Sequence, residues 1–433
     1  MAKRIVVIGA GIAGLATAEL LQRYPGNSVI LVEATEQVGS GSSMDQHGWF
    51  HAGSLYSLRS NHLTMSSALS NLSVLIDHYA NFFGAKPEDD GPPLPSTWFE
   101  ARSIQYLFPG DHGALVESFL ADPRGYKDRA LRNFTEHAGA IATAEARMGR
   151  MLGFDRVLNG IKLVGADSPM RTPTIVRDLA ESFLTNGGAI RFGAVCLGYE
   201  RQAAGDIKVS LAGGESVTAN ELIFCTGGQS QGAHHMHTKA SVRKSPVLVS
   251  SPKLWPDNLV VVEDENYPSL SHILHRFHGI EYSVISGGYS ADAEDIEGQK
   301  RIAEELRQVV LRYFPTRAQD AKMQVFFGTK VDLEGDGNAR DYSPQIAELD
   351  ANVLSIFPGK FSFSFLLAKD VARRIMNCSA VPEAPAVRSS IDARRVARPR
   401  HELIAGELID QELHRHLQAD FLAKLVCPKP LVT

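Results

Sequence analysis

Residues 5–14, IVVIGAGIAG, and residues 29–33, VILVE, decide the fold of this chain. The run from Ile5 to Ile8 is apolar and β-branched throughout, which is typical of a parallel strand buried on both faces. Glycines follow at once, and apolar residues then recur at helical spacing until Pro25 stops the run. A second apolar strand ends at Glu33. The sequence therefore predicts one complete unit of strand, turn, helix and strand.

The glycines of this turn each allow a contact that a side chain would block. Gly9 permits the tight turn, Gly11 lets the backbone approach a pyrophosphate, and Gly14 lets the helix pack closely on the strand. The helix that follows begins with Ile12 and Ala13, and its N-terminus presents unpaired N–H groups to an anion. The sequence therefore predicts a phosphate-binding turn.

Glu33 closes the second strand, nineteen residues after Gly14. A carboxylate at this place accepts the hydroxyls of an adenosine ribose and repels a ribose phosphate. Together with the glycine turn, Glu33 predicts a site for an adenine dinucleotide other than NADP. These residues alone do not separate NAD from FAD.

Three later segments carry a resemblance to a known family. Residues 39–43 read GSGSS and are followed by GWFHAGSLY at 48–56, residues 222–228 read LIFCTGG, and residues 357–362 read FPGKFS. In order and spacing they resemble the D-amino acid oxidase superfamily of FAD-dependent oxidoreductases. That superfamily includes glycine oxidase, L-2-hydroxyglutarate dehydrogenase and glycerol-3-phosphate dehydrogenase. The resemblance implies that the dinucleotide is FAD.

The same resemblance implies which residues contact the cofactor besides the glycine turn and Glu33. They are Ser42, Ser43, Thr226, Gly227, Gly359, Lys360, Phe361 and Ser362. A helix N-terminus after the last of these segments would stabilise negative charge near the reduced flavin ring. We expect the FAD to be non-covalent, because Asp45 and Gln46 stand where some relatives carry the attached histidine.

Four residues are candidate catalytic groups by resemblance. His51 belongs to a His-Ala-Gly segment most like the 2-hydroxyglutarate branch, and His272 stands where relatives have a Tyr or His that faces the flavin. A neutral imidazole can accept a hydroxyl or ammonium proton as general base. Lys330 replaces an arginine that pairs with the substrate carboxylate, and Arg340 resembles a charged element of glycerol-3-phosphate dehydrogenases. Because lysine cannot make the planar two-point contact of arginine, either the acid is held differently or the substrate is not a simple α-acid.

The distribution of helix and strand patterns predicts an α/β fold, a Rossmann-type FAD-binding domain with an inserted β-sheet-rich substrate domain. We assign the FAD-binding domain to 1–80, 172–232 and 326–380, and the substrate domain to 81–171 and 233–325. Residues 381–433 follow as an Arg-rich arm with an amphipathic helix. That last segment either docks on the body or makes a subunit or membrane-surface contact.

Composition excludes several classes of protein. The chain has 433 residues, 44% of them hydrophobic and 21% charged, with a net charge of −5. We expect a globular protein of more than one domain that does not bind nucleic acid. No segment supplies the roughly 18 apolar residues of a membrane span. The four scattered cysteines suit a reducing compartment, so a cytoplasmic location is expected. We expect no metal, because His234, His235 and His237 lack the spacing that fixes a metal geometry.

The sequence thus predicts an enzyme that oxidises the C–H bond beside an amine or hydroxyl of a small amino acid, amine or 2-hydroxy acid, with hydride transfer to flavin N5. Oxygen or another electron acceptor would take the electrons. A monoamine-oxidase-like amine oxidase or desaturase is one alternative, although it would have Gly-Gly-Arg where Gly39-Ser40-Gly41 stands. A non-redox FAD-containing partner-binding protein is another. The residues do not decide the substrate, the acceptor or whether the chain forms a homo-oligomer.

Overall fold

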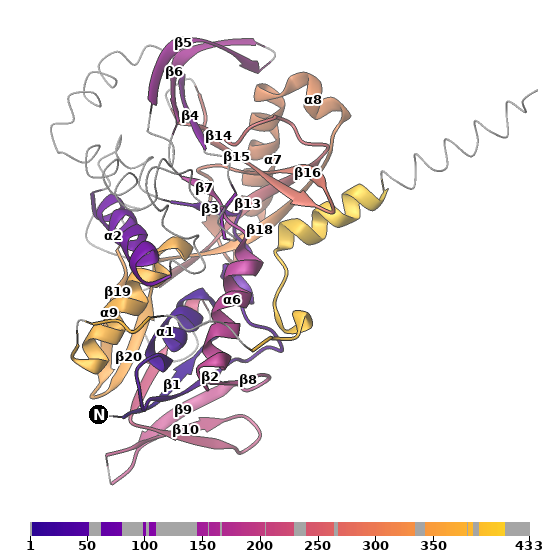
Figure 1. The fold of residues 1–433 in the computed structure, drawn as a ribbon. Helices are drawn as coiled ribbons and strands as arrows, with labels where there is room; N and C mark the ends of the chain where they lie inside the picture. The colour runs from indigo at the N-terminus through magenta and orange to yellow at the C-terminus, as the bar shows by residue number, and fades with distance from the viewer. Residues whose placement is uncertain are drawn as a thin grey trace, which may run out of the picture.

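Figure 1 shows the described chain as two sheets, one above the other, with the N-terminus beside the lower sheet. The computed structural model describes residues 2–51, 62–79, 98–100, 104–109, 145–154, 156–164, 167–203, 205–228, 240–263, 267–333, 343–378, 380–383 and 389–411. The predicted α/β fold is confirmed.

The lower sheet begins with the predicted strand, turn, helix, strand unit, which is also confirmed: β1 is Arg4–Ile8, α1 is Ile12–Gln22 and β2 is Ser28–Val32. The strand order is β19-β20-β12-β1-β2-β8, and every neighbouring pair except β19 and β20 is parallel. The remaining bounds are β8 Ala189–Arg191, β12 Glu221–Phe224, β19 Gln345–Asp350 and β20 Val353–Phe357. Strands from distant parts of the chain therefore lie side by side.

The apolar sequence of β1 is explained by its burial on both faces. Ile5 and Val7 face a helical layer, whereas Val6 and Ile8 face a small sheet on the opposite side. The helical layer consists of α1, α6 (Thr172–Thr185) and α9 (Ser364–Met376); α2 (His62–His78) packs beside α9. The small sheet consists of β9 (Cys196–Arg201), β10 (Ile207–Leu211) and β11 (Ser216–Ala219). An alternating strand could not satisfy both layers.

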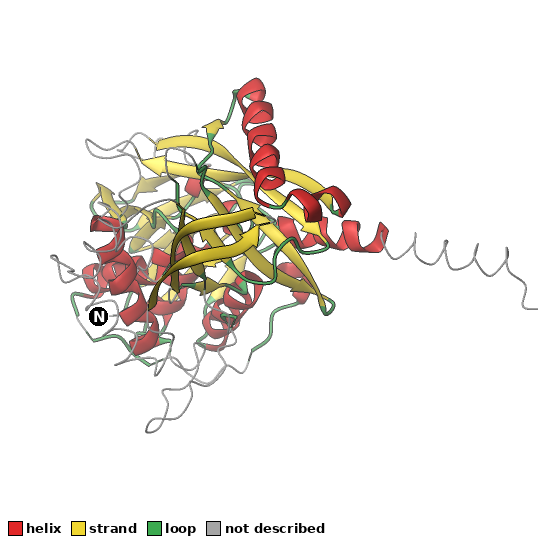
Figure 2. Ribbon diagram, turned by 90° about the horizontal axis from the view of Figure 1, so that it is seen from above, coloured by secondary structure: helices red, strands yellow, loops and turns green. Residues whose placement is uncertain are grey.

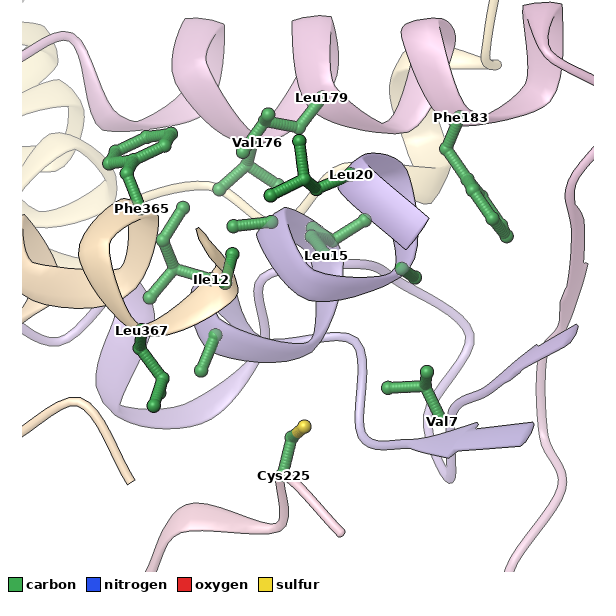
Figure 3. Packing of buried hydrophobic residues seen from close by; sticks show 14 of the residues in the cluster. Val7, Ile12, Leu15, Leu20, Val176, Leu179, Phe183, Cys225, Phe365 and Leu367 are labelled. Atoms are coloured by element: carbon green, nitrogen blue, oxygen red, sulfur yellow. The ribbon is translucent and has the colours of Figure 1, made fainter. Parts of the chain in front are cut away.

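The helical layer packs around α1. Figure 3 shows the side chains of this cluster: Ile12, Leu15 and Leu20 on α1, Val176, Leu179 and Phe183 on α6, and Phe365 and Leu367 on α9. Leu15 and Leu20 are fully buried. Each such side chain stabilises the fold by roughly 1.5–3 kcal/mol. This packing holds the start of α1, and with it the glycine turn, against the end of β1.

Within the described residues, the upper sheet has nine strands in the order β17-β13-β16-β15-β14-β4-β6-β5, with β18 paired to β13. Their bounds are β4 Gln105–Pro109, β5 Glu145–Phe154, β6 Arg156–Val164, β13 Ala240–Ser251, β14 Leu259–Val261, β15 Leu270–Phe277, β16 Ile280–Ser286, β17 Ala291–Asp292 and β18 Lys322–Leu333. Helices α7 (Ile296–Tyr313) and α8 (Pro315–Asp320) cover one face. Figure 2 looks down on these strands and shows helices on both sides of them.

One predicted domain boundary needs correction. Residues 326–333, assigned above to the FAD-binding domain, belong to β18, which pairs with β13 along its whole length. They therefore lie in the upper sheet. A two-residue strand, β3 (Trp49–Phe50), pairs with β7 (Ser168–Pro169) and links the segment after β2 to the segment before α6.

The C-terminal segment 389–411 docks on the body. The N–H of Val38 donates to the carbonyl of Arg395, and the N–H of Arg400 donates to the carbonyl of Met44. A helix that begins at residue 400 then covers the second face of the upper sheet. Several arginines of the arm are ion-paired: Arg394 with Asp392, Arg395 with Glu36 and Arg398 with Glu402. Of the helices in the described ranges, none is long and apolar enough to cross a bilayer.

Candidate cofactor and active site

The parallel strands of the lower sheet bring the predicted cofactor segments to one edge. Gly9 follows β1, Glu33 follows β2, Thr226 follows β12 and Gly359 follows β20. These four strands are hydrogen-bonded neighbours in the order β20-β12-β1-β2. Because the carboxyl ends of parallel strands meet at one edge, segments from both ends of the chain converge there.

The glycine turn has a backbone that only glycine allows. Gly9 has a φ of +101°, and its N–H donates to the carbonyl of Val32 at 2.8 Å. A Cβ on Gly9 would lie 2.7 Å from the carbonyl oxygen of Cys225, and a Cβ on Gly14 would lie 1.8 Å from the carbonyl oxygen of Gly9. Gly11 occupies the N-cap of α1 and supplies no side chain to cap the helix. The geometry suits a backbone that binds a pyrophosphate.

Glu33 is held rigidly beside this turn. Its Oε2 accepts the N–H of Ala10 at 2.7 Å, and its Oε1 accepts the N–H and the hydroxyl of Thr35, each at 2.9 Å. The side chain is buried. A carboxylate offers about four acceptor positions, so Glu33 keeps capacity for ribose hydroxyls. The residue therefore fits the adenosine end of FAD.

The GS loop, which we define as residues 39–51, is tied to the glycine turn. The N–H of Gly39 donates to the carbonyl of Ala10, and Ser43 Oγ accepts the N–H of Ile12 at 3.1 Å. Ser42 is exposed in the same short helix, η1 (Gly41–Ser43). Ser43 thus lies at the start of α1, while the contact of Ser42 with FAD stays a prediction.

The last predicted turn lies between β20 and α9. Gly359 has a φ of +73°, and η4 (Phe361–Phe363) leads directly into α9. Among the described residues, the buried hydroxyl of Ser362 has no hydrogen-bond partner. Because such an orphaned group costs about 1–3 kcal/mol, the site favours an additional polar partner. The donor set therefore fits FAD, with Thr226 and Gly227 just after the neighbouring strand β12.

A group of polar and aromatic side chains gathers around Asp167. This carboxylate is fully buried, and its Oδ2 accepts the indole N–H of Trp49 at 3.1 Å and the hydroxyl of Tyr106 at 2.6 Å. His51 Nδ1 lies 3.9 Å from the same oxygen, and the His51 and Trp49 rings are 4.3 Å apart. The pairing of β3 with β7 brings these residues together.

His51 is kept neutral by its surroundings. Burial lowers the pKa of His51 well below its usual value of 6.5, and the positive charge of Lys360 and the neighbouring His47 lower it further. Lys360, in the last cofactor turn, thus lies near enough to His51, at the end of the GS loop, for its charge to act on this imidazole. A largely buried histidine that is unprotonated at neutral pH can accept a proton, as a general base must, and the nearby cation makes it a weaker base.

A second histidine group lies behind the GS loop. His275 Nε2 donates to the carbonyl of His47 at 3.0 Å, and its ring lies 4.4 Å from that of His401. His401 Nδ1 accepts the hydroxyl of Tyr282 at 2.9 Å. Burial lowers the pKa of His47 to about 3 and also lowers those of His275 and His401. Gly48 is needed here, since a Cβ would lie 2.4 Å from the His275 ring.

The structure does not bring His272 to this site, so its expected position facing the flavin is wrong. His272 is fully buried on the face of β15 covered by α7 and α8, where its ring packs against Phe314. Its Nδ1 donates to the carbonyl of Asp257, and its Nε2 accepts the Ser283 hydroxyl. His275, three residues later, faces the GS loop instead. Both nitrogens of His272 are used, and its role is structural.

Lys330 and Arg340 are the two residues predicted to bind an anionic group of the substrate, and the structure describes only the first of them. Lys330 lies on β18 opposite Arg243, two residues after Gly328, where a Cβ would lie 2.5 Å from the carbonyl oxygen of Asp45. Lys330 is thus on the strand that touches the GS loop, and its contact with substrate stays a prediction. Arg340 lies outside the described residues. So do His234, His235 and His237; the part of the chain that the structure describes contains no group of three or more side chains suited to a metal ion.

Sequence reasoning missed Asp167 and Tyr106. Both lie in the stretch 96–171, where no motif or clear periodicity occurs. Trp49 packs beside these residues, and its indole N–H donates to Asp167. No local signal could have found these contacts, because they depend on the pairing of β3 with β7.

Known proteins share this architecture. The L-α-glycerophosphate oxidase of Mycoplasma pneumoniae, solved with FAD bound, aligns with a TM-score of 0.62 at 16% identity, covering 90% of this chain and 98% of that one. The glycine oxidase of Geobacillus kaustophilus aligns with a TM-score of 0.57 at 15% identity, covering 90% and 100%. At sequence identities of 15% and 16%, these structural similarities show a shared fold and nothing more.

The matches in sequence differ in extent. The L-amino acid oxidase of Cerastes cerastes is 47% identical over 51 residues, which are 11% of this chain and only 10% of that protein. By contrast, the model of the FAD dependent oxidoreductase family DAO matches residues 4–374. Together with the converging dinucleotide segments, this match shows that the chain belongs to the DAO family of FAD-dependent oxidoreductases and that its cofactor is FAD.

Proposed function

We propose that this enzyme oxidises the C–H bond beside the amine or hydroxyl of a small amino acid, amine or 2-hydroxy acid. Bound FAD supplies the acceptor for the hydride. The observation that carries the proposal is the position of His51 at the end of the GS loop, 3.9 Å from the buried Asp167 carboxylate and against the Trp49 indole, in surroundings that lower its pKa. The monoamine-oxidase-like alternative has less support, because residues 39–41 do not match its Gly-Gly-Arg.

In this proposal His51 acts as general base. Its Nε2 accepts the proton of the substrate hydroxyl or ammonium group while the C–H hydrogen leaves with both electrons, so that a C=O or C=N bond forms. Lys360 holds positive charge at the same place, which favours an anionic substrate group or developing negative charge. Lys330 is the further candidate for binding an acidic group of the substrate, as a point charge.

The test is anaerobic mixing of the purified protein with amino acids, amines, 2-hydroxy acids and glycerol phosphate. Loss of the oxidised-flavin absorbance with one class identifies the substrate. His51→Gln should lower the rate of that reduction by about 100- to 10,000-fold, the usual contribution of a general base. A full panel without any reduction, or a His51→Gln protein as fast as the wild type, would count against the proposal. Reoxidation by air or by an artificial acceptor then distinguishes oxidase from dehydrogenase.

A further inference from the structure

Asp167 is a charged group in an unusual place. Its side chain is fully buried, and a buried carboxylate is costly unless it is hydrogen-bonded. Trp49 and Tyr106 both donate to the single oxygen Oδ2. The main chain is fixed as well, because the N–H of Ile104 donates to the Asp167 carbonyl at 3.0 Å and β7 begins at the next residue. The carboxylate is thus held in one orientation.

This orientation faces His51. The distance of 3.9 Å from Oδ2 to Nδ1 is too long for a hydrogen bond, but it allows a strong attraction to a protonated ring, since burial reduces screening. The His51 ring also lies against the indole of Trp49, with an angle of 36° between the planes. Asp167 is therefore placed to act on His51 in two ways, through its charge and through the indole that it binds.

We propose that Asp167 is a positioning residue for His51: it keeps the N–H on Nδ1, so that Nε2 is the nitrogen that accepts the substrate proton. The inference rests on the proposed function. Once Nε2 is protonated, Nδ1–H points toward a carboxylate that offsets the new charge. The other charged or titratable groups that act on this ring, Lys360 and His47, have the opposite effect and disfavour the protonated form.

The same contacts also fit a purely structural role, in which Asp167 only accepts the hydrogen bonds of Trp49 and Tyr106. The two roles differ in their effect on the pH dependence. Removing the negative charge should make His51 a weaker base, and this should move the acidic limb of kcat/KM to lower pH. Removing only the Tyr106 hydroxyl leaves the charge in place, and the limb should stay at the wild-type pH.

The kinetic test compares Asp167→Asn with Tyr106→Phe in the holoenzyme. It uses a substrate that the anaerobic panel described above identifies. We expect Asp167→Asn to lower kcat on the order of 100-fold with little change in KM, and to move the acidic limb as described. FAD content and melting temperature of both variants show whether the fold is retained. If the acidic limb of kcat/KM lies at the same pH in both variants and their melting temperatures fall by similar amounts, the role of Asp167 is purely structural and the proposal is overturned.

A second measurement does not depend on turnover. Nitrogen-15 NMR of the histidine-labelled holoenzyme with oxidised FAD, with His51 assigned from the His51→Gln spectrum, reports which ring nitrogen carries the proton. We expect Nδ1–H in the wild type and a shift toward Nε2–H in Asp167→Asn. A wild-type ring protonated on Nε2 would disprove the positioning role. If instead no substrate reduces the flavin but the tautomer shifts as expected, the proposed function fails, and what stands is that Asp167 keeps the N–H of His51 on Nδ1.

Discussion

At the scale of single residues, the cofactor site depends on glycines, because a residue with a Cβ would not fit in the turn. Gly9 and Gly14 leave the room in which the start of α1 meets the end of β1, and each Cβ would collide with a backbone carbonyl. Ser43 and Glu33 then bind the N–H groups of Ile12 and Ala10. Small changes here should act on FAD binding before they act on any other property, because the turn lies at the edge where the cofactor segments converge.

Gly14→Ala should therefore release FAD. The added Cβ would lie 1.8 Å from the carbonyl oxygen of Gly9, so helix and turn must separate. Overpacking of this kind costs about 1–3 kcal/mol. The flavin absorbance per mole of purified protein and the melting temperature should both fall. Gly288→Ala is the matched control, because its Cβ would meet its neighbours no closer than 3.9 Å. Full FAD content in Gly14→Ala would show that the turn tolerates the shift.

At the scale of elements, the helix that begins at residue 400 shows how one face is selected. Ile404, Ala405, Leu408 and Ile409 are buried against β13, β16 and β18, while Leu403 is exposed. The helix follows a segment whose backbone is hydrogen-bonded to Val38 and Met44 in the lower part of the molecule. The C-terminal segment therefore links the GS loop to the upper sheet.

Leu408→Ala should destabilise the protein by about 2–5 kcal/mol, because it leaves a cavity between this helix and the upper sheet. Leu403→Ala changes the same residue type on the same helix at a site that is 44% exposed, and it should change stability by less than about 0.5 kcal/mol. Urea unfolding of the two variants measures the difference. Equal effects would mean that the helix is not docked in solution.

The histidine group behind the GS loop should make stability depend on pH. The folded-state pKa values of His47, His275 and His401 lie below the unfolded value near 6.5, so below that pH the unfolded chain binds more protons. The contribution of these histidines to the free energy of unfolding is therefore fully present above pH 6.5. It is lost as the pH decreases from 6.5 toward 3. A histidine that stays neutral in the folded chain over this range should contribute roughly 1 kcal/mol of loss between pH 7 and pH 5.5.

Urea unfolding at these two pH values tests this expectation, and His275→Gln should reduce the difference between them by the share of one histidine. If the wild-type stability is the same at pH 7 and pH 5.5, these histidines are not buried in the neutral form. The comparison uses the change with pH and not the absolute stability, so the packing lost in the variant does not affect the conclusion.

At the scale of the whole molecule, FAD binding depends on parts of the chain that are far apart in sequence. The glycine turn, the GS loop and the turn before α9 come together only when the lower sheet is complete. The C-terminal segment then covers the GS loop from outside. The cofactor should therefore be released when the tertiary structure is lost, unless it is attached covalently.

Acid precipitation should accordingly leave the flavin in the supernatant. The GS loop carries Asp45 and Gln46 where some relatives carry the attached histidine, and Gln46 is engaged with Thr172 at 2.6 Å. The absorbance of supernatant and pellet measures the partition. Yellow protein in the pellet would mean a covalent bond and would show that another side chain forms it.

Much of the cofactor site could be predicted from the sequence, because its constraints are local. A β-branched strand, three glycines and an acid at the end of the next strand each act within a few residues, so the pattern predicts both the backbone and the ligand. The bounds of β1 and β2 agree with that pattern within one residue. Less could be predicted for the catalytic groups, because their surroundings are built from distant segments.

The sequence by itself thus determined the dinucleotide turn and the acid at the end of the second strand, and its resemblance to a family predicted His51 as a catalytic candidate. Only the tertiary structure decided that His272 faces away and that Asp167 faces His51. A strand places alternate side chains on opposite faces, and which face looks toward the cofactor depends on pairing across the whole sheet. Likewise, Asp167 meets Trp49 where β3 pairs with β7, and it meets Tyr106 where the backbone before β4 bonds to its carbonyl; no local pattern encodes these long-range contacts.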